Sequence, residues 1–269
     1  MWPVFATYVA VVVGLPLAEL GAVAVWTAMD ETRRGRAIDL AASPDLLVLS
    51  VLISSTTLIA VSLLGGRLAP ERARARLRTG PAHAPWSRIV VAVVGFLALS
   101  QAFDSLFALL GWSERGTLGM LHRAIAQMSA GLLVLMLLVA GLLAGTGEEL
   151  FFRGFMQTRL AACWRPWAAI TVTAAAFALL HFDPVQSAFA FVVGVFLGWI
   201  TELTGSIRPA VWAHVLNNSV SVLQPGFLPR PASSWIEIGL LALCLSVMAG
   251  SVVVLRRGRP VSVGAHGTC

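Results

Sequence analysis

The sequence predicts an all-α membrane protein, a polytopic bundle of about eight transmembrane helices. Hydrophobic residues make up 58% of its 269 residues and charged residues only 12%, whereas a soluble domain contains roughly 45–50% apolar and about 25% charged residues. The mean hydropathy is +0.83. Apolar runs recur with about the 20 residues that an α-helix needs to cross a bilayer. These observations exclude a soluble globular protein and a disordered chain.

Eight apolar runs can be read as candidate membrane-spanning helices. The first, second, fourth and eighth are long and nearly uncharged. The fifth to seventh are short and close together, so a re-entrant segment is the alternative for one of them. The runs lie near residues 3–28, 45–66, 89–111, 124–146, 167–182, 185–203, 207–223 and 234–255.

The arginines predict the orientation of the bundle. With eight spans, thirteen of the nineteen Arg fall on the side of both termini and six on the opposite side. Because cytoplasmic loops are enriched in Arg and Lys, both termini are expected in the cytoplasm. This placement also accounts for the net charge of +6 without a nucleic-acid partner.

The first motif that could carry chemistry contains Glu148, Glu149 and Arg153, and it is expected at the cytoplasmic end of the fourth run. Glu149 precedes Arg153 by one turn, which is the favourable orientation for an ion pair. This pair would leave Glu148, about 100° away around the helix, without a local partner. An unpaired carboxylate in a low-dielectric site can act as a general base. A solvated helix end with an incidental ion pair is the alternative.

Two further motifs lie on the fifth and seventh runs. Phe177 and His181 are one turn apart on one face, where a satisfied core or interfacial histidine is the alternative. His214 and Asn218 are also one turn apart, which suits either contact between helices or stabilisation of a developing oxyanion. An acid, an imidazole and a donor pair on three runs together favour a catalytic site.

Other acidic residues lie in or beside the apolar runs. Glu19 is in the first run and Asp104 in the third. Lining of a substrate cavity, pairing with an Arg, and a proton or ion path are the alternatives for both. Glu202 lies at the end of a run and is expected to be solvated.

The ordered set of motifs resembles the signature of the CPBP intramembrane proteases, which include the CAAX prenyl endopeptidases and the bacteriocin-processing Abi proteins. The resemblance covers residues 145–222, whereas residues 1–120 match only as generic apolar helices. The motifs that carry it are Glu148-Glu149-xxx-Arg153, Phe177-xxx-His181 and His214-xxx-Asn218.

The resemblance implies a role for each matching residue. Glu148 would activate a water molecule that His181 helps to hold, and His214 and Asn218 would form the oxyanion hole. Glu149, Arg153 and Phe177 would support them. We expect no cofactor; the alternative is a zinc site with Glu148, His181 and His214 as ligands, since these are ordinary zinc ligands.

We therefore expect an intramembrane endopeptidase that cleaves a membrane-borne or lipidated peptide or protein. Residues 1–120 would supply three N-terminal helices on the substrate side, residues 121–260 the catalytic core and residues 261–269 a tail. The expected location is a bacterial cytoplasmic (inner) membrane. A non-enzymatic immunity or assembly protein and a proton-coupled transporter are the alternatives.

Overall fold

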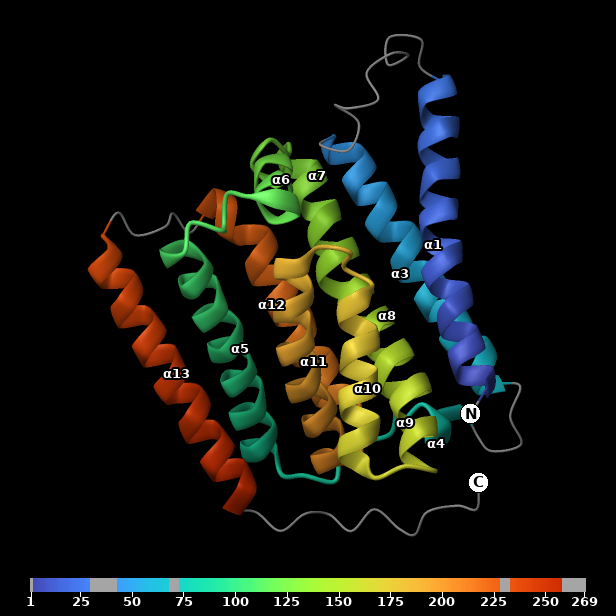
Figure 1. The fold of residues 1–269 in the computed structure, drawn as a ribbon, viewed down its shortest axis with the longest axis vertical. Helices are drawn as coiled ribbons and strands as arrows, with labels where there is room; N and C mark the ends of the chain where they lie inside the picture. Colours follow the sequence, from blue (N-terminus) through green and yellow to red (C-terminus); the bar gives the residue numbers. More distant parts are fainter. Residues whose placement is uncertain (1, 30–42, 68–72, 228–232, 258–269) are drawn as a thin grey trace.

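The computed structural model describes residues 2–29, 43–67, 73–227 and 233–257. All regular secondary structure within them is helical, which confirms the predicted fold class (Figure 1). The expected tail, residues 261–269, lies outside the described residues. The elements are α1 (Trp2–Met29), α3 (Pro44–Arg67), α4 (Ala73–Arg76), α5 (Trp86–Leu109), α6 (Gly116–Ala126), α7 (Ala130–Met136), η2 (Leu137–Ala144), α8 (Gly145–Glu149), η3 (Leu150–Gln157), α9 (Thr158–Ala161), α10 (Pro166–Leu179), α11 (Pro184–Thr204), α12 (Arg208–Phe227) and α13 (Ser234–Arg257).

All eight apolar runs form helices, but not all are long and apolar enough to span a bilayer alone. Six helical segments among the described residues meet that condition. The other two are α10, whose 14 residues extend about 21 Å, and the more polar α12. The six segments are Trp2–Val25, Pro44–Arg67, Trp86–Leu109, Ala130–Ala161, Pro184–Thr204 and Ser234–Arg257.

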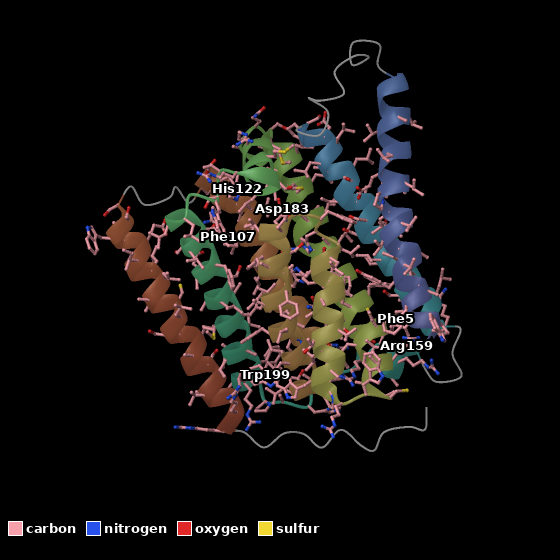
Figure 2. All side chains as sticks on the ribbon, in the orientation of Figure 1. Phe5, Phe107, His122, Arg159, Asp183 and Trp199 are labelled. Atoms are coloured by element: carbon pink, nitrogen blue, oxygen red, sulfur yellow. The ribbon has the colours of Figure 1, made fainter. Side chains whose placement is uncertain are left out.

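Successive long helices alternate in direction along the bundle (Figure 1). One end of the bundle, hereafter the arginine-rich end, contains the starts of α1, α5, α10 and α12 and the ends of α3, α11 and α13. Arg159 and Trp199 lie toward this end, and His122 and Asp183 lie toward the opposite one (Figure 2). This is the relative sidedness that the distribution of Arg predicts.

The centre of the bundle is one continuous helical segment, Ala130–Ala161, in which the π-helices η2 and η3 flank α8. The fourth run was expected to end near residue 146, with Glu148, Glu149 and Arg153 at that end; this prediction was wrong, because the helix continues to Ala161. The helix continues because every side chain of η3 is buried and its arginine has a buried acidic partner. Glu148 and Glu149 therefore lie near the middle of the segment.

The chain between α3 and α5 is attached to the bundle at the arginine-rich end. Leu77 is buried against Gly154, where a Cβ atom would lie 3.0 Å from the Leu77 carbonyl oxygen. Arg78 forms an ion pair of 2.6 Å with Glu202, which also accepts a hydrogen bond of 2.9 Å from Gln157. Glu202 is therefore paired rather than solvated, because the loop that precedes α5 folds beneath the end of α11.

Candidate active site

The short helix α8 places Glu148 and Glu149 at the junction between two π-helical segments. A π-helix widens the helical turn and frees backbone groups from the usual i to i−4 hydrogen bonds, and such segments recur at functional sites. Here the Ala140 carbonyl of η2 accepts a hydrogen bond of 3.0 Å from Asn218 Nδ2. Asn218 therefore holds α12 against the segment that carries both glutamates.

Glu149 is fully buried and accepts two short hydrogen bonds through the same oxygen. Arg153 Nη1 and His214 Nδ1 each lie 2.7 Å from Glu149 Oε1. Arg153 is also buried, and its second terminal nitrogen donates to the Gly194 carbonyl at 3.1 Å. The structure thus contains the ion pair expected within one helix, and it adds two partners from α12 and α11.

His214 lies between the two glutamates. Its Nε2 is 3.4 Å from Glu148 Oε2, while its Nδ1 donates to Glu149. The Glu148 side chain is 24% exposed and that of Glu149 is 0% exposed. Glu148 is therefore the accessible carboxylate of the pair, and Glu149 fixes the orientation of the imidazole. The resemblance implied an oxyanion role for His214 and did not anticipate this bridge.

Phe177 connects the two histidines. Its ring centroid lies 5.0 Å from that of His181 and 5.9 Å from that of His214, both in edge-to-face geometry. The Arg153 guanidinium lies 4.9 Å from the same ring. Phe177 is 3% exposed, so it forms a dry wall beside the cluster.

His181 lies just beyond the end of α10, two residues after Leu179. Its Nδ1 is 3.1 Å from the Phe177 carbonyl oxygen, and donation to that oxygen leaves Nε2 with a lone pair in the neutral ring. Within the described residues, no ion pair joins His181 to Glu148 or Glu149. Any cooperation between His181 and Glu148 therefore requires a bridging molecule such as water.

The two other acids of the apolar runs have separate partners. Glu19 of α1 is hydrogen-bonded to Ser50 of α3. Asp104 of α5 accepts a hydrogen bond of 2.7 Å from Gln224 of α12 and one of 3.2 Å from Gln101. Each acid thus takes part in a polar contact outside the His214 cluster, and the contact of Asp104 with Gln224 was not anticipated.

No group of three or more His, Cys, Asp or Glu side chains that could hold a metal is found in the described ranges. Glu149 and the Phe177 carbonyl already engage one ring nitrogen of His214 and of His181, respectively. The metal-free mechanism and its zinc alternative both remain predictions.

These features define a helical membrane protein with a buried cluster of two glutamates, a histidine and an arginine. Residues 130–220 match the family model described as type II CAAX prenyl endopeptidase Rce1-like. This match covers about a third of the chain and confirms the CPBP resemblance predicted from the three motifs. The matched range contains all seven residues of these motifs and falls within the expected core of 121–260. No curated protein and no solved structure matches the chain.

Proposed function

We propose that this protein is an intramembrane endopeptidase in which Glu148 activates water for hydrolysis of a peptide bond. The observation that carries the proposal is the position of the His214 imidazole between an accessible and a fully buried glutamate. Buried charges in a bilayer are costly and mark functional sites. The Rce1-like domain supports the class of reaction.

The two glutamates have different roles in this mechanism. Glu149 is the structural acceptor of the cluster, because Arg153 and His214 both donate to it at 2.7 Å. Glu148 takes one proton from a water molecule as the remaining hydroxide attacks the peptide carbonyl carbon. It then delivers that proton to the amide nitrogen as the carbon–nitrogen bond breaks. His181, through the free lone pair of Nε2, accepts a hydrogen bond from the same water.

The negative charge on the carbonyl oxygen requires donors. A protonated His214 presents Nε2–H, and Asn218 retains one amide hydrogen beyond the one donated to Ala140. With an imidazolium, the Glu148, Glu149, Arg153 and His214 cluster is electrically neutral before the reaction. A neutral cluster lowers the cost of holding these groups in a low-dielectric interior.

The substrate is a membrane-borne or lipidated peptide or protein, because the glutamates lie near the middle of a membrane-spanning segment. Its cleavage site must enter the bundle together with water. The proposed location is a bacterial cytoplasmic membrane, with the arginine-rich end in the cytoplasm.

The test is hydrolysis of fluorogenic peptides, free and lipidated, by the purified full chain in liposomes. Glu148→Gln keeps the side-chain volume and removes the base, so the rate should fall by about 10²–10⁴-fold. The fold of the variant is checked by its unfolding temperature. The cleavage should resist a zinc chelator, whereas loss in chelator and recovery with zinc would establish the metal alternative.

The same variants separate the two rival functions. An immunity or assembly protein that uses these residues only to join helices would show no cleavage and would retain its stability with Glu148→Gln. In a proton-coupled transporter, Asp104→Asn and Glu19→Gln would reduce the activity of the protein at least as strongly as His214→Ala does. Cleavage that survives Asp104→Asn and Glu19→Gln but not His214→Ala contradicts the transporter.

A further inference from the structure

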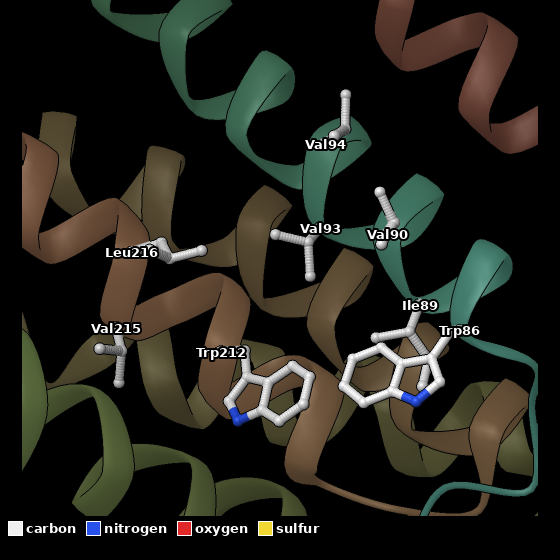
Figure 3. Close-up of a pocket in the computed structure, with 8 residues that line it drawn as sticks. All are labelled: Trp86, Ile89, Val90, Val93, Val94, Trp212, Val215 and Leu216. Carbon is white, nitrogen blue, oxygen red and sulfur yellow. The ribbon is translucent and has the colours of Figure 1, made fainter.

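An apolar groove lies between α5 and α12, on the outside of the bundle (Figure 3). Its volume is about 380 Å³, within the range of ligand pockets. The side chains that line it come from these two helices, and none of them is charged. Several of them are about half-exposed, including Val90, Val94 and Leu216. In a bilayer such a groove faces the hydrocarbon of the lipids.

Two tryptophans form the end of the groove where the helices begin. Trp86 and Trp212 stack with ring centroids 5.0 Å apart and an interplanar angle of 18°. Their indole nitrogens lie on the side of the rings away from Val94 (Figure 3). Tryptophans with this orientation are typical of the membrane–water interface, where the apolar ring faces lipid and the N–H faces water.

The same end of the groove is positively charged. Arg208 precedes Trp212 by one turn and Val215 by two, so it lies on the groove face of α12. Its side chain is exposed, and its Nε donates to the Thr79 carbonyl at 2.9 Å. A guanidinium has five N–H donors, so four remain for a ligand.

The helix termini add to this charge. Both α5 and α12 begin at the arginine-rich end (Figure 1), so their positive dipole ends lie at the same end of the groove. From Trp86 to Val94 the groove follows α5 for about 12 Å. A phosphate group at the mouth and a hydrocarbon chain along the groove match these two regions.

We propose that this groove binds an anionic glycerophospholipid, with its phosphate at Arg208 and one acyl chain against Val90, Val94 and Leu216. The Trp86–Trp212 pair lies between the two regions. Cations and helix N-termini both attract a phosphate, and an anionic lipid lacks the headgroup cation that offsets this attraction in a zwitterionic lipid. This site is independent of the proposed peptidase activity, because its lining contains none of the residues of the cluster.

The test uses nanodiscs that contain the full chain and a phospholipid with a photoreactive group on its acyl chain. Phosphatidylglycerol and phosphatidylcholine probes are compared at equal mole fraction, and labelled peptides are identified by mass spectrometry. Labelling of α5 and α12 by phosphatidylglycerol should exceed that by phosphatidylcholine. Arg208→Gln should lower the ratio of phosphatidylglycerol labelling to phosphatidylcholine labelling by about fivefold, the factor expected for one Arg facing anionic lipid.

Matched variants test whether lipid labelling depends on Arg208 and Trp212 in particular. Arg208→Lys retains the charge and should retain most of the preference, and Arg257→Gln removes an exposed Arg from the same end and should have no effect. Trp212→Ala should lower labelling of the groove, whereas Trp235→Ala, an exposed residue of α13, should not. Equal labelling by both wild-type probes, or a ratio unchanged in Arg208→Gln, would overturn the proposal and indicate ordinary boundary lipid.

Discussion

At the scale of single residues, Glu148 and Glu149 are adjacent in sequence but differ in their surroundings. Glu149 has no exposed surface and holds two charged or polar partners, whereas Glu148 is 24% exposed and faces one imidazole nitrogen. The difference arises because neighbouring residues of a helix point about 100° apart. The same side-chain type therefore serves as a structural anion in one position and as the candidate base in the next.

Replacing each glutamate with glutamine should lower the free energy of unfolding by different amounts. Glu149→Gln leaves Arg153 buried without its counter-ion, and breaking a buried pair costs about 3–5 kcal/mol. Glu148→Gln should cost less than about 1 kcal/mol, because its side chain is partly solvated. Unfolding of the purified protein in detergent measures both values. Equal losses in the two variants would contradict the assignment of Glu149 as the structural partner.

Asp183 provides a pH-dependent contribution to stability at the start of α11. The largest effect on the pKa of its carboxyl group is a hydrogen bond from the Gln186 backbone, which lowers the pKa. Burial raises the pKa, and hydrogen bonds from Thr117 and Val185 lower it further, so the net shift is downward. A lowered pKa in the folded state stabilises the protein above the unfolded value of about 3.9. The contribution disappears as the pH falls through the folded value.

The stability difference between wild type and Asp183→Asn should therefore be constant near neutrality and narrow below about pH 4. Unfolding temperatures of the two proteins at several pH values measure it. Asn also caps helices well, so the hydrogen bond to the first turn is largely retained in the variant. A difference that widens on acidification would show that the folded-state pKa is raised instead.

The sequence alone predicted those residue contacts that lie within one helix. The Glu149–Arg153 pair follows from a spacing of four residues, and the face shared by His214 and Asn218 follows in the same way. The His214 contacts with both glutamates join segments 65 residues apart, and no local spacing encodes them. The Gly194 carbonyl that accepts from Arg153 is a backbone group, which a list of polar side chains does not reveal.

At the scale of elements, glycines allow α8 to approach its neighbours closely. A Cβ atom on Gly147 would lie 2.9 Å from the Ser55 carbonyl oxygen of α3, and one on Gly145 would lie 3.0 Å from the Val215 backbone nitrogen. Small residues at such contacts are typical of helix packing in membranes. These contacts fix α8 between α3 and α12, and thereby set the distance between Glu148 and His214.

Gly147→Ala should destabilise the protein, because the added methyl group meets backbone atoms that have little freedom to move. Gly131→Ala in α7 is the matched control, since no atom lies within 4 Å of its Cβ position. The control should be neutral or stabilising by up to about 1 kcal/mol, the helix propensity difference between Gly and Ala. Only Gly147→Ala should lower the unfolding temperature, and an equal decrease in both variants would contradict the packing argument.

Hydropathy predicted every long helix, but it placed the end of the fourth apolar run too early in the sequence. Three charged residues between 148 and 153 reduce the apolarity of the run, although the helix continues to Ala161. The cost of burying Arg153 and Glu149 is reduced because the two charges neutralise one another, an effect that a sum over single residues omits. The two π-helical segments were also not foreseen, because periodicity and propensity describe α-helical spacing.

At the scale of the whole molecule, charge is distributed unevenly between the two ends of the bundle. Arg78, Arg88, Arg165 and Arg208 lie near one end, and α13 finishes there with Arg256 and Arg257. The alternation of helices brings these arginines together even though they are distant in sequence. A spanning count that was wrong by one would have divided them between the two sides.

The orientation can be tested with cysteines placed at the two ends of the bundle. In a variant without native cysteines, Pro81→Cys introduces a thiol at an exposed position of the arginine-rich end, and Glu114→Cys introduces one at the opposite end. Because Arg-rich ends stay in the cytoplasm, a membrane-impermeant thiol reagent added to intact cells should label Glu114→Cys and not Pro81→Cys. Opening the cells should make both thiols reactive. Labelling of Pro81→Cys alone in intact cells would reverse the orientation, and with it the side from which water and substrate reach Glu148.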